Sequence, residues 1–175
     1  ISNNELFAQK LQKRITPDYL RNTQPNHSAS LLLALIEQEE YGYDYQKLVV
    51  DTANMLGAEL AHLGFKVAQL DYKIFTFTHQ LFLLMSEEET RSFYLTAKRY
   101  NISLNKKHKK LFDNDGIRIG TQQIARYNWN KPEVEILAKL IYSIKVKDYA
   151  QIENTRNALI AKKIPHFTYE DISIK

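Results

Sequence analysis

The chain has 175 residues, no cysteine, five glycines and a formal net charge of +4, with 44% hydrophobic and 25% charged residues. This balance is typical of a folded globular protein, and the length suits one domain or one domain with an arm. Disulfides, thiolate metal sites and cysteine nucleophiles are excluded, and no glycine spacing fits a nucleotide-binding loop. The longest apolar run, 31–36, is far shorter than the roughly 20 residues of a membrane span.

The start of the chain predicts an arm and then two helices. Residues 1–27 contain two turn-forming stretches, Thr16-Pro17-Asp18 and Thr23-Gln24-Pro25-Asn26, and are expected to form an arm or connection. A helix is expected from Ser28 or Ser30 to about Tyr41, with Gly42 separating it from a second helix over 44–63. That second helix carries an apolar stripe at steps of three and four, and Gly64 is expected to end it.

The rest of the chain combines short strands with helices. Ser86 and Glu89 form a capping box that predicts a helix reaching about Tyr100. Runs of helix beside a small sheet, without regular alternation, predict an α+β fold. The expected strands are 65–70, 78–84, 102–104 and 116–119, and the further helices are 122–127, one starting near Pro132, and 148–162.

The histidines and one basic run are the first features of the sequence that bear on binding sites. The five histidines are spread along the chain, and no two of them lie at metal-ligand spacing, so no metal site is expected. The run 106–110, Lys-Lys-His-Lys-Lys, is expected to be a loop. It is interpreted either as an anion- or nucleic-acid-binding patch or as an ordinary solvated loop.

Arg118 is the most informative residue. It stands between Ile117 and Ile119, with Gly116 and Gly120 outside them. Alternation in a strand puts the two isoleucines on one face and Arg118 on the other. A guanidinium in that position needs an anionic partner, and a carboxylate fits its planar fork. The partner is either a ligand or an Asp or Glu of the same domain.

The segment 116–122, Gly-Ile-Arg-Ile-Gly-Thr-Gln, with Arg126 eight residues after Arg118, resembles the small domain of serine hydroxymethyltransferase, a fold-type I pyridoxal-phosphate enzyme. The resemblance extends over about residues 15–147. It includes the long helix ending in Leu-Gly-Phe-Lys-Val (63–67), the strand His-Gln-Leu-Phe-Leu-Leu (79–84), Ile-Ser-Leu-Asn-Lys (102–106) and the helix after Pro-Glu-Val-Glu (132–135).

The resemblance implies the C-terminal small domain of such an enzyme, with a small, mainly antiparallel sheet, helices on one face and a long interdomain helix before it. Residues 1–27 would be the connection from a missing large domain, 28–64 the interdomain helices and 65–175 the small domain. The parent enzyme is expected to use pyridoxal 5'-phosphate, to act on amino acids in the cytoplasm and to form a homodimer. No catalytic residue is expected in this chain.

The resemblance also implies roles for individual residues. Arg118 would bind the α-carboxylate of the amino-acid substrate, with Thr121 and Arg126 supporting the turn that aims it. The loop near the cofactor phosphate would contribute three more residues, Gln24, His27 and Ser28.

Departures from the family pattern leave part of the reaction open. Near the folate contacts of the family, this chain has His79-Gln80 in place of Asn-His and Asn105-Lys106-Lys107 in place of Asn-Lys-Asn. Tetrahydrofolate use is therefore doubtful, and aldol-type cleavage, transfer and transamination all remain. The cofactor lysine would lie before Ile1, so the chain alone is expected to be inactive. The alternative is a non-catalytic anion- or nucleic-acid-binding module that uses loop 106–110.

Overall fold

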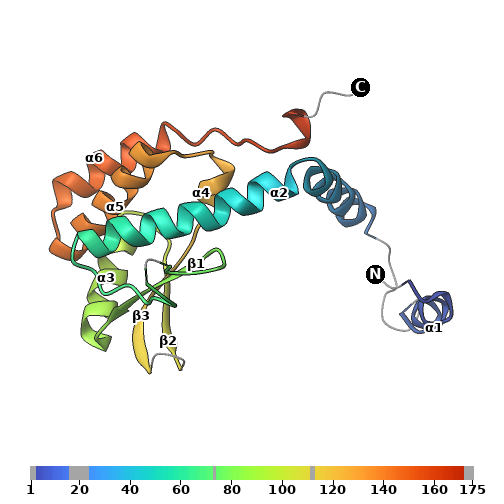
Figure 1. Ribbon diagram of the computed structural model, residues 1–175, viewed down its shortest axis with the longest axis horizontal. Helices are drawn as coiled ribbons and strands as arrows, with labels where there is room; N and C mark the ends of the chain where they lie inside the picture. The colour runs from blue at the N-terminus through green and yellow to red at the C-terminus, as the bar shows by residue number, and fades with distance from the viewer. Residues whose placement is uncertain (1–2, 16–23, 73, 111–112, 172–175) are drawn as a thin grey trace. The chain divides into compact units, whose positions relative to one another are not determined.

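The computed structural model describes residues 3–15, 24–72, 74–110 and 113–171 (Figure 1). The chain divides into two compact units, Ile1–Glu39 and Glu40–Lys175. The first unit contains helix α1 (Glu5–Ile15), which buries none of its residues, and the first part of helix α2 (Pro25–His62). The turn expected at Thr16-Pro17-Asp18 lies outside the described residues.

Helix α2 is continuous from Pro25 to His62, so the prediction of two helices separated at Gly42 is wrong. A single glycine inside a helix costs only about 1 kcal/mol relative to alanine, which a helix of this length tolerates. The predicted start at Ser28 or Ser30 is also wrong. Proline suits the first position of a helix because its ring already holds φ at a helical value, so the helix begins at Pro25 rather than after it.

The end of α2 agrees with the sequence. Gly64 has a φ of +80°, its N–H donates to the Ala61 carbonyl at 3.0 Å, and the Phe65 N–H donates to the Leu60 carbonyl at 3.0 Å. These two bonds form the Schellman motif, which a left-handed glycine makes possible. The expected helix-ending role of Gly64 is confirmed.

The second unit contains a three-stranded antiparallel sheet in the order β1-β3-β2. Its strands are β1 (Gln80–Met85), β2 (Asn105–Lys109) and β3 (Asn114–Gly120). Leu81 pairs with Ile119 and Leu83 with Ile117, and all four side chains are buried on one face. The predicted α+β fold with a small antiparallel sheet is confirmed.

Two strand predictions need correction. Within the segment 65–70 only Val67 makes a bridge, to Leu83, although hydrogen bonds from Ala68 to Phe82 and from Leu84 to Lys66 hold the segment beside β1. The segment 102–104 is not a strand, and most of the expected loop 106–110 lies in β2 instead. Pairing with β3 gives these lysines and His108 a backbone hydrogen-bond ladder, while their side chains remain on the exposed surface.

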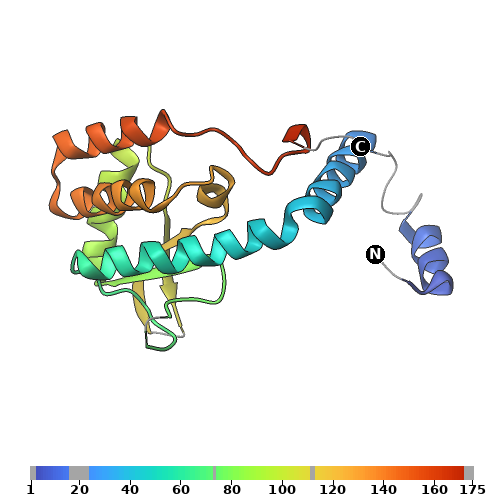
Figure 2. The ribbon, with the colours of Figure 1, turned by 45° about the horizontal axis from the view of Figure 1, so that its top comes forward.

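Helices cover the buried face of this sheet. Helix α3 (Glu87–Arg99) begins with the predicted capping box, because Ser86 and Glu89 each accept the other's backbone N–H. Helices α5 (Lys131–Val146) and α6 (Tyr149–Ile160) run side by side (Figure 2). The remaining elements are α4 (Gln122–Arg126) and the short 3-10 turn η1 (Tyr169–Asp171).

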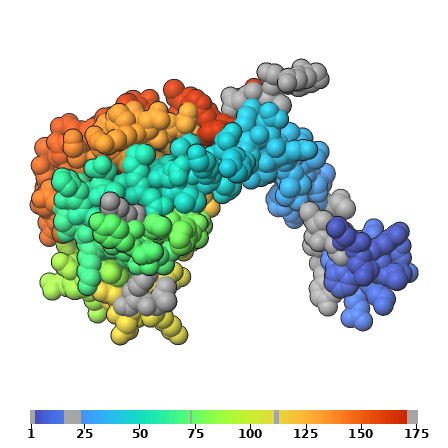
Figure 3. Space-filling model, in the orientation of Figure 1, coloured from blue at the N-terminus to red at the C-terminus, as the bar shows by residue number. Residues whose placement is uncertain are grey.

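One hydrophobic core joins the sheet to the helices. The part of α2 beyond Glu40 lies across the front of the second unit, between α5–α6 and the sheet (Figure 3). None of the described helices is both long and apolar enough to cross a membrane. The core includes Leu56 and Leu60 of α2, Leu81 and Leu83 of β1, Phe93 of α3, Ile117 and Ile119 of β3, Val134 and Ile141 of α5, and Ile152 of α6.

Candidate functional site

Arg118 lies in the central strand of the sheet. It pairs in register with Phe82 of β1 and Asn105 of β2. Its neighbours Ile117 and Ile119 are 0% and 8% exposed and belong to the helix-covered core. Because side chains alternate along a strand, Arg118 lies on the face opposite the helices, where it is half-buried.

The guanidinium of Arg118 has no carboxylate partner in the described part of the chain, where it makes neither a hydrogen bond nor an ion pair. The described residues therefore give no support to the alternative in which an Asp or Glu of the same domain neutralises it. A half-buried charge without a partner is unfavourable, so this position favours an anionic ligand.

The two glycines around Arg118 differ in their surroundings. A Cβ added to Gly116 would lie 1.9 Å from the Leu83 carbonyl oxygen, whereas one added to Gly120 would have its nearest neighbours at 3.7 and 3.8 Å. Gly116 is therefore required by the close approach of β1 to β3. Gly120 has ordinary room for a methyl group.

Thr121 anchors the end of β3 to two other segments. Its side chain is fully buried, and its hydroxyl lies 2.9 Å from the Val49 carbonyl of α2 and 3.2 Å from the His79 carbonyl at the start of β1. Its backbone N–H also donates to His79 at 3.0 Å. These contacts determine where the chain turns after the strand that carries Arg118.

Helix α4 follows this turn directly and is held from α2 and from the C-terminal segment. The Tyr45 hydroxyl donates to the Gln122 carbonyl at 3.1 Å, and the Arg126 carbonyl accepts the His166 N–H at 2.7 Å. Burial raises the pKa of Tyr45, an effect that the nearby Arg126 charge partly opposes. Tyr45 is therefore a neutral hydrogen-bond donor at physiological pH.

A cavity whose wall includes Arg118 lies mostly on the helix-covered side of the sheet, the side opposite the face assigned to the Arg118 side chain. Its volume is about 620 Å³, which is in the range of small-molecule sites. Its wall includes Arg118, Gly120, Gln123 and Tyr127, together with apolar side chains of α5 and α6.

The residues expected near a phosphate belong to the first unit. Gln24, His27 and Ser28 are all exposed, at the start of α2. The N–H groups of His27 and Ser28 both donate to the Gln24 carbonyl, at 3.0 and 3.2 Å. These two amides are therefore already engaged within the chain and are not available to an anion.

Sequence reasoning missed the aromatic residues that fasten the C-terminal segment. The Phe167 ring lies 5.8 Å from that of Tyr41 and 5.9 Å from that of Tyr45, and the Trp129 indole donates to the Lys162 carbonyl at 2.9 Å. The spacing of Tyr41 and Tyr45, one helical turn apart, was the available signal. Nothing in the sequence identified Phe167 as their partner.

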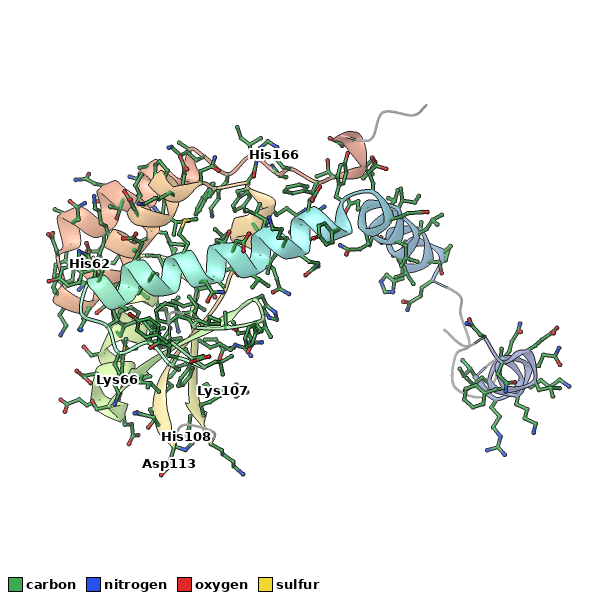
Figure 4. The ribbon with its side chains drawn as sticks, in the orientation of Figure 1. His62, Lys66, Lys107, His108, Asp113 and His166 are labelled. Carbon is green, nitrogen blue, oxygen red and sulfur yellow. The ribbon has the colours of Figure 1, made fainter. Side chains whose placement is uncertain are left out.

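Two side chains of the basic run have contacts within the same unit. His108 lies 3.7 Å from Asp113 (Figure 4) and 3.4 Å from Asp115, and the Lys106 ammonium lies 5.9 Å from the Tyr94 ring centre. The described residues contain no group of three or more His, Cys, Asp or Glu able to hold a metal ion. This strand therefore offers weaker support for a binding site than Arg118 does.

The chain is similar to curated serine hydroxymethyltransferases, although no family model matches it. The enzyme of Methanocella arvoryzae is 28% identical over 98% of this chain. Those of Thermoplasma volcanium and Methanocaldococcus jannaschii are each 31% identical, over 78% and 79% of it. The chain spans 40%, 34% and 35% of these three relatives, respectively.

A solved structure of another enzyme has a similar fold. The crystal structure of L-threonine transaldolase from Pseudomonas fluorescens matches with a TM-score of 0.69 and 21% identity, over 81% of this chain and 34% of that one. The expected resemblance to serine hydroxymethyltransferase is confirmed, as is the α+β fold of a part of a fold-type I pyridoxal-phosphate enzyme.

Proposed function

We propose that this chain is the substrate-recognition part of a pyridoxal-phosphate enzyme similar to serine hydroxymethyltransferase, in which Arg118 binds the α-carboxylate of an amino acid. Residues 1–27 would connect it to a large domain, 28–64 would form the interdomain helix and 65–175 the small domain. The parent would be a cytoplasmic homodimer acting in amino-acid metabolism, with the covalent chemistry assigned to the length that this chain does not span.

One observation carries the proposal. Arg118 is a half-buried guanidinium in the central strand without a carboxylate partner among the described residues. A bidentate pair with a substrate carboxylate would satisfy both its charge and its planar hydrogen-bonding geometry. The resemblance to serine hydroxymethyltransferase supports the same role.

Arg118 would act by orientation. A carboxylate held at two points cannot rotate freely, so the bonds at the neighbouring Cα take a defined direction. Pyridoxal phosphate, when bound, supplies an electron sink for the bond that breaks at that carbon. Thr121 would fix the turn after β3 and Arg126 would support it, so that the guanidinium keeps its direction.

The chain's own residues fit a substrate carboxylate better than they fit the cofactor. Gln24, His27 and Ser28 could offer side chains to the cofactor phosphate, but two of the local amides already donate to Gln24. We therefore assign most of the cofactor's binding to the rest of the parent protein. Tetrahydrofolate is not included in this proposal, because Lys107 departs from the Asn-Lys-Asn pattern of the family that the sequence resembles.

The test is Arg118→Ala in the full-length protein that contains this chain. Loss of a bidentate, partly desolvated carboxylate contact should weaken amino-acid binding by about 3 kcal/mol, or roughly a hundredfold. The cofactor's absorbance should be unchanged. Arg118→Lys keeps the charge but loses the fork, so we expect an intermediate affinity.

Arg91→Ala is the matched control, because Arg91 is an exposed arginine on α3 outside the candidate site. It should leave the amino-acid affinity unchanged. Unchanged affinity in Arg118→Ala, measured by titration of the cofactor spectrum with amino acid, would refute the assignment.

A further inference from the structure

We propose that the C-terminal segment 162–169 is a strap that keeps α4, and through it Arg118, in the substrate-binding position, with Phe167 as its main positioning residue. The functional part of this inference rests on the proposed function. The structural part, in which the strap orders α4, does not depend on the proposed function.

The strap is fastened at two points by backbone groups. The Trp129 indole donates to the Lys162 carbonyl at 2.9 Å, and the Lys162 ammonium lies 2.6 Å from Glu133, so the segment leaves α6 in a defined direction. Four residues later the His166 N–H donates to the Arg126 carbonyl at 2.7 Å. This bond joins the strap to the last residue of α4.

Phe167 gives the strap its third attachment. Its ring contacts the rings of Tyr41 and Tyr45, with centres 5.8 and 5.9 Å away. Its φ is +58°, a left-handed backbone conformation that is unfavourable for a bulky residue. Such a conformation persists only where surrounding contacts impose it, so the aromatic packing outweighs the backbone strain.

These attachments all contact α4, a helix that depends on tertiary contacts for its position. Helix α4 has five residues, which is too short to be stable without tertiary contacts. Thr121 holds its start, the Tyr45 hydroxyl holds Gln122, and the strap holds Arg126. Phe167 also packs on Tyr45, so the strap acts on both ends of α4.

Arg118 is three residues before Thr121, on the strand that leads into this helix. Loosening α4 would give the end of β3 and the guanidinium more freedom. A less well positioned guanidinium binds carboxylate more weakly, whereas groups supplied by the rest of the parent would be unaffected. The strap should therefore influence the KM for the amino acid more than kcat.

The test is Phe167→Ala in the full-length protein. In hydrogen exchange, we expect the amides of Ala125, Tyr127 and Asn128 to exchange roughly tenfold faster. In kinetics, the KM for the amino acid should rise about tenfold with little change in kcat and in cofactor absorbance. Phe167→Tyr keeps the ring and should restore both values.

Ile164→Ala is the matched control, because Ile164 lies in the same segment but is 64% exposed. It should change neither readout. His166→Pro removes the N–H that reaches Arg126, although it also fixes the local φ, and it replaces Phe167→Ala if that variant does not fold. Unchanged exchange of α4 in the folded variant would overturn the strap.

The failure of each proposal can be distinguished. Faster α4 exchange with an unchanged KM would overturn the positioning of Arg118 by the strap, while the ordering of α4 by the strap would still hold. If Arg118→Ala itself has no effect on amino-acid affinity, the proposed function fails, and the exchange measurement alone then decides whether the strap orders α4.

Discussion

The buried hydroxyl of Thr121 joins β3 to α2, and Thr121→Val removes it while keeping a side chain of similar shape. The hydroxyl lies 2.9 Å from the Val49 carbonyl and 3.2 Å from the His79 carbonyl. Thr121 itself is 0% exposed. The substitution therefore tests one tertiary contact without opening a cavity.

The expected cost is modest because neither carbonyl is left without a donor. Val49 lies inside α2, so its carbonyl keeps the N–H four residues later, and the His79 carbonyl keeps the Thr121 N–H at 3.0 Å. The loss should thus be that of one net hydrogen bond, about 1 kcal/mol, rather than a full desolvation penalty. For a domain of this size, that corresponds to about 3 °C in Tm.

The assay is urea unfolding of the 175-residue chain, with Thr155→Val as the matched control. Thr155 is also buried, at 6% exposure, but its hydroxyl donates to Gln151 in its own helix, at 2.6 Å. Such a local bond adds little to stability, so Thr155→Val should cost about 0.5 kcal/mol or less. An equal loss in the two variants would refute the anchoring role of Thr121.

Two further predictions concern the close approach of two strands and the capping box. Gly116→Ala would force a Cβ to within 1.9 Å of the Leu83 carbonyl and should cost at least about 2 kcal/mol in urea unfolding. Gly120→Ala, with 3.7 Å of room, should stay within about 0.5 kcal/mol. Hydrogen bonds from the Ser86 backbone N–H and hydroxyl hold the pKa of Glu89 below its ordinary value of 4.5. The carboxylate therefore stabilises the fold above that value, and this contribution is lost as the pH falls through the lower folded-state pKa. Glu89→Gln should accordingly destabilise the chain more at pH 7 than at pH 3, and an equal effect at both would contradict the assignment.

Local signals in the sequence predicted the elements that depend on local chemistry. The capping box at Ser86, the glycine end of α2 at Gly64 and the alternation around Arg118 are each encoded within a few residues. Each appears as expected. The resemblance around 116–122 identified the candidate site from equally local evidence.

The errors arose where distant contacts decide the structure. The basic run is a strand because β3 supplies its hydrogen-bond ladder, and propensity alone does not predict lysines in an extended ladder. Gly42 was interpreted as a break, but the surrounding helix tolerates it. The strap depends on Phe167 meeting residues more than 120 positions earlier, and no periodicity in the sequence encodes that contact.

The two outer strands of the sheet have consequences for how the protein behaves in a crowded solution. An open strand edge is a template for pairing with another chain. Along β1 the backbone groups of Phe82 and Leu84 are already bonded to the segment containing Lys66 and Ala68. Along β2 the side chains are mostly exposed and cationic, so a second copy would bring like charges together. The sheet is thus protected against sheet-extending aggregation by cover on one side and by repulsion on the other, and neutralising the lysines of β2 should remove the second protection.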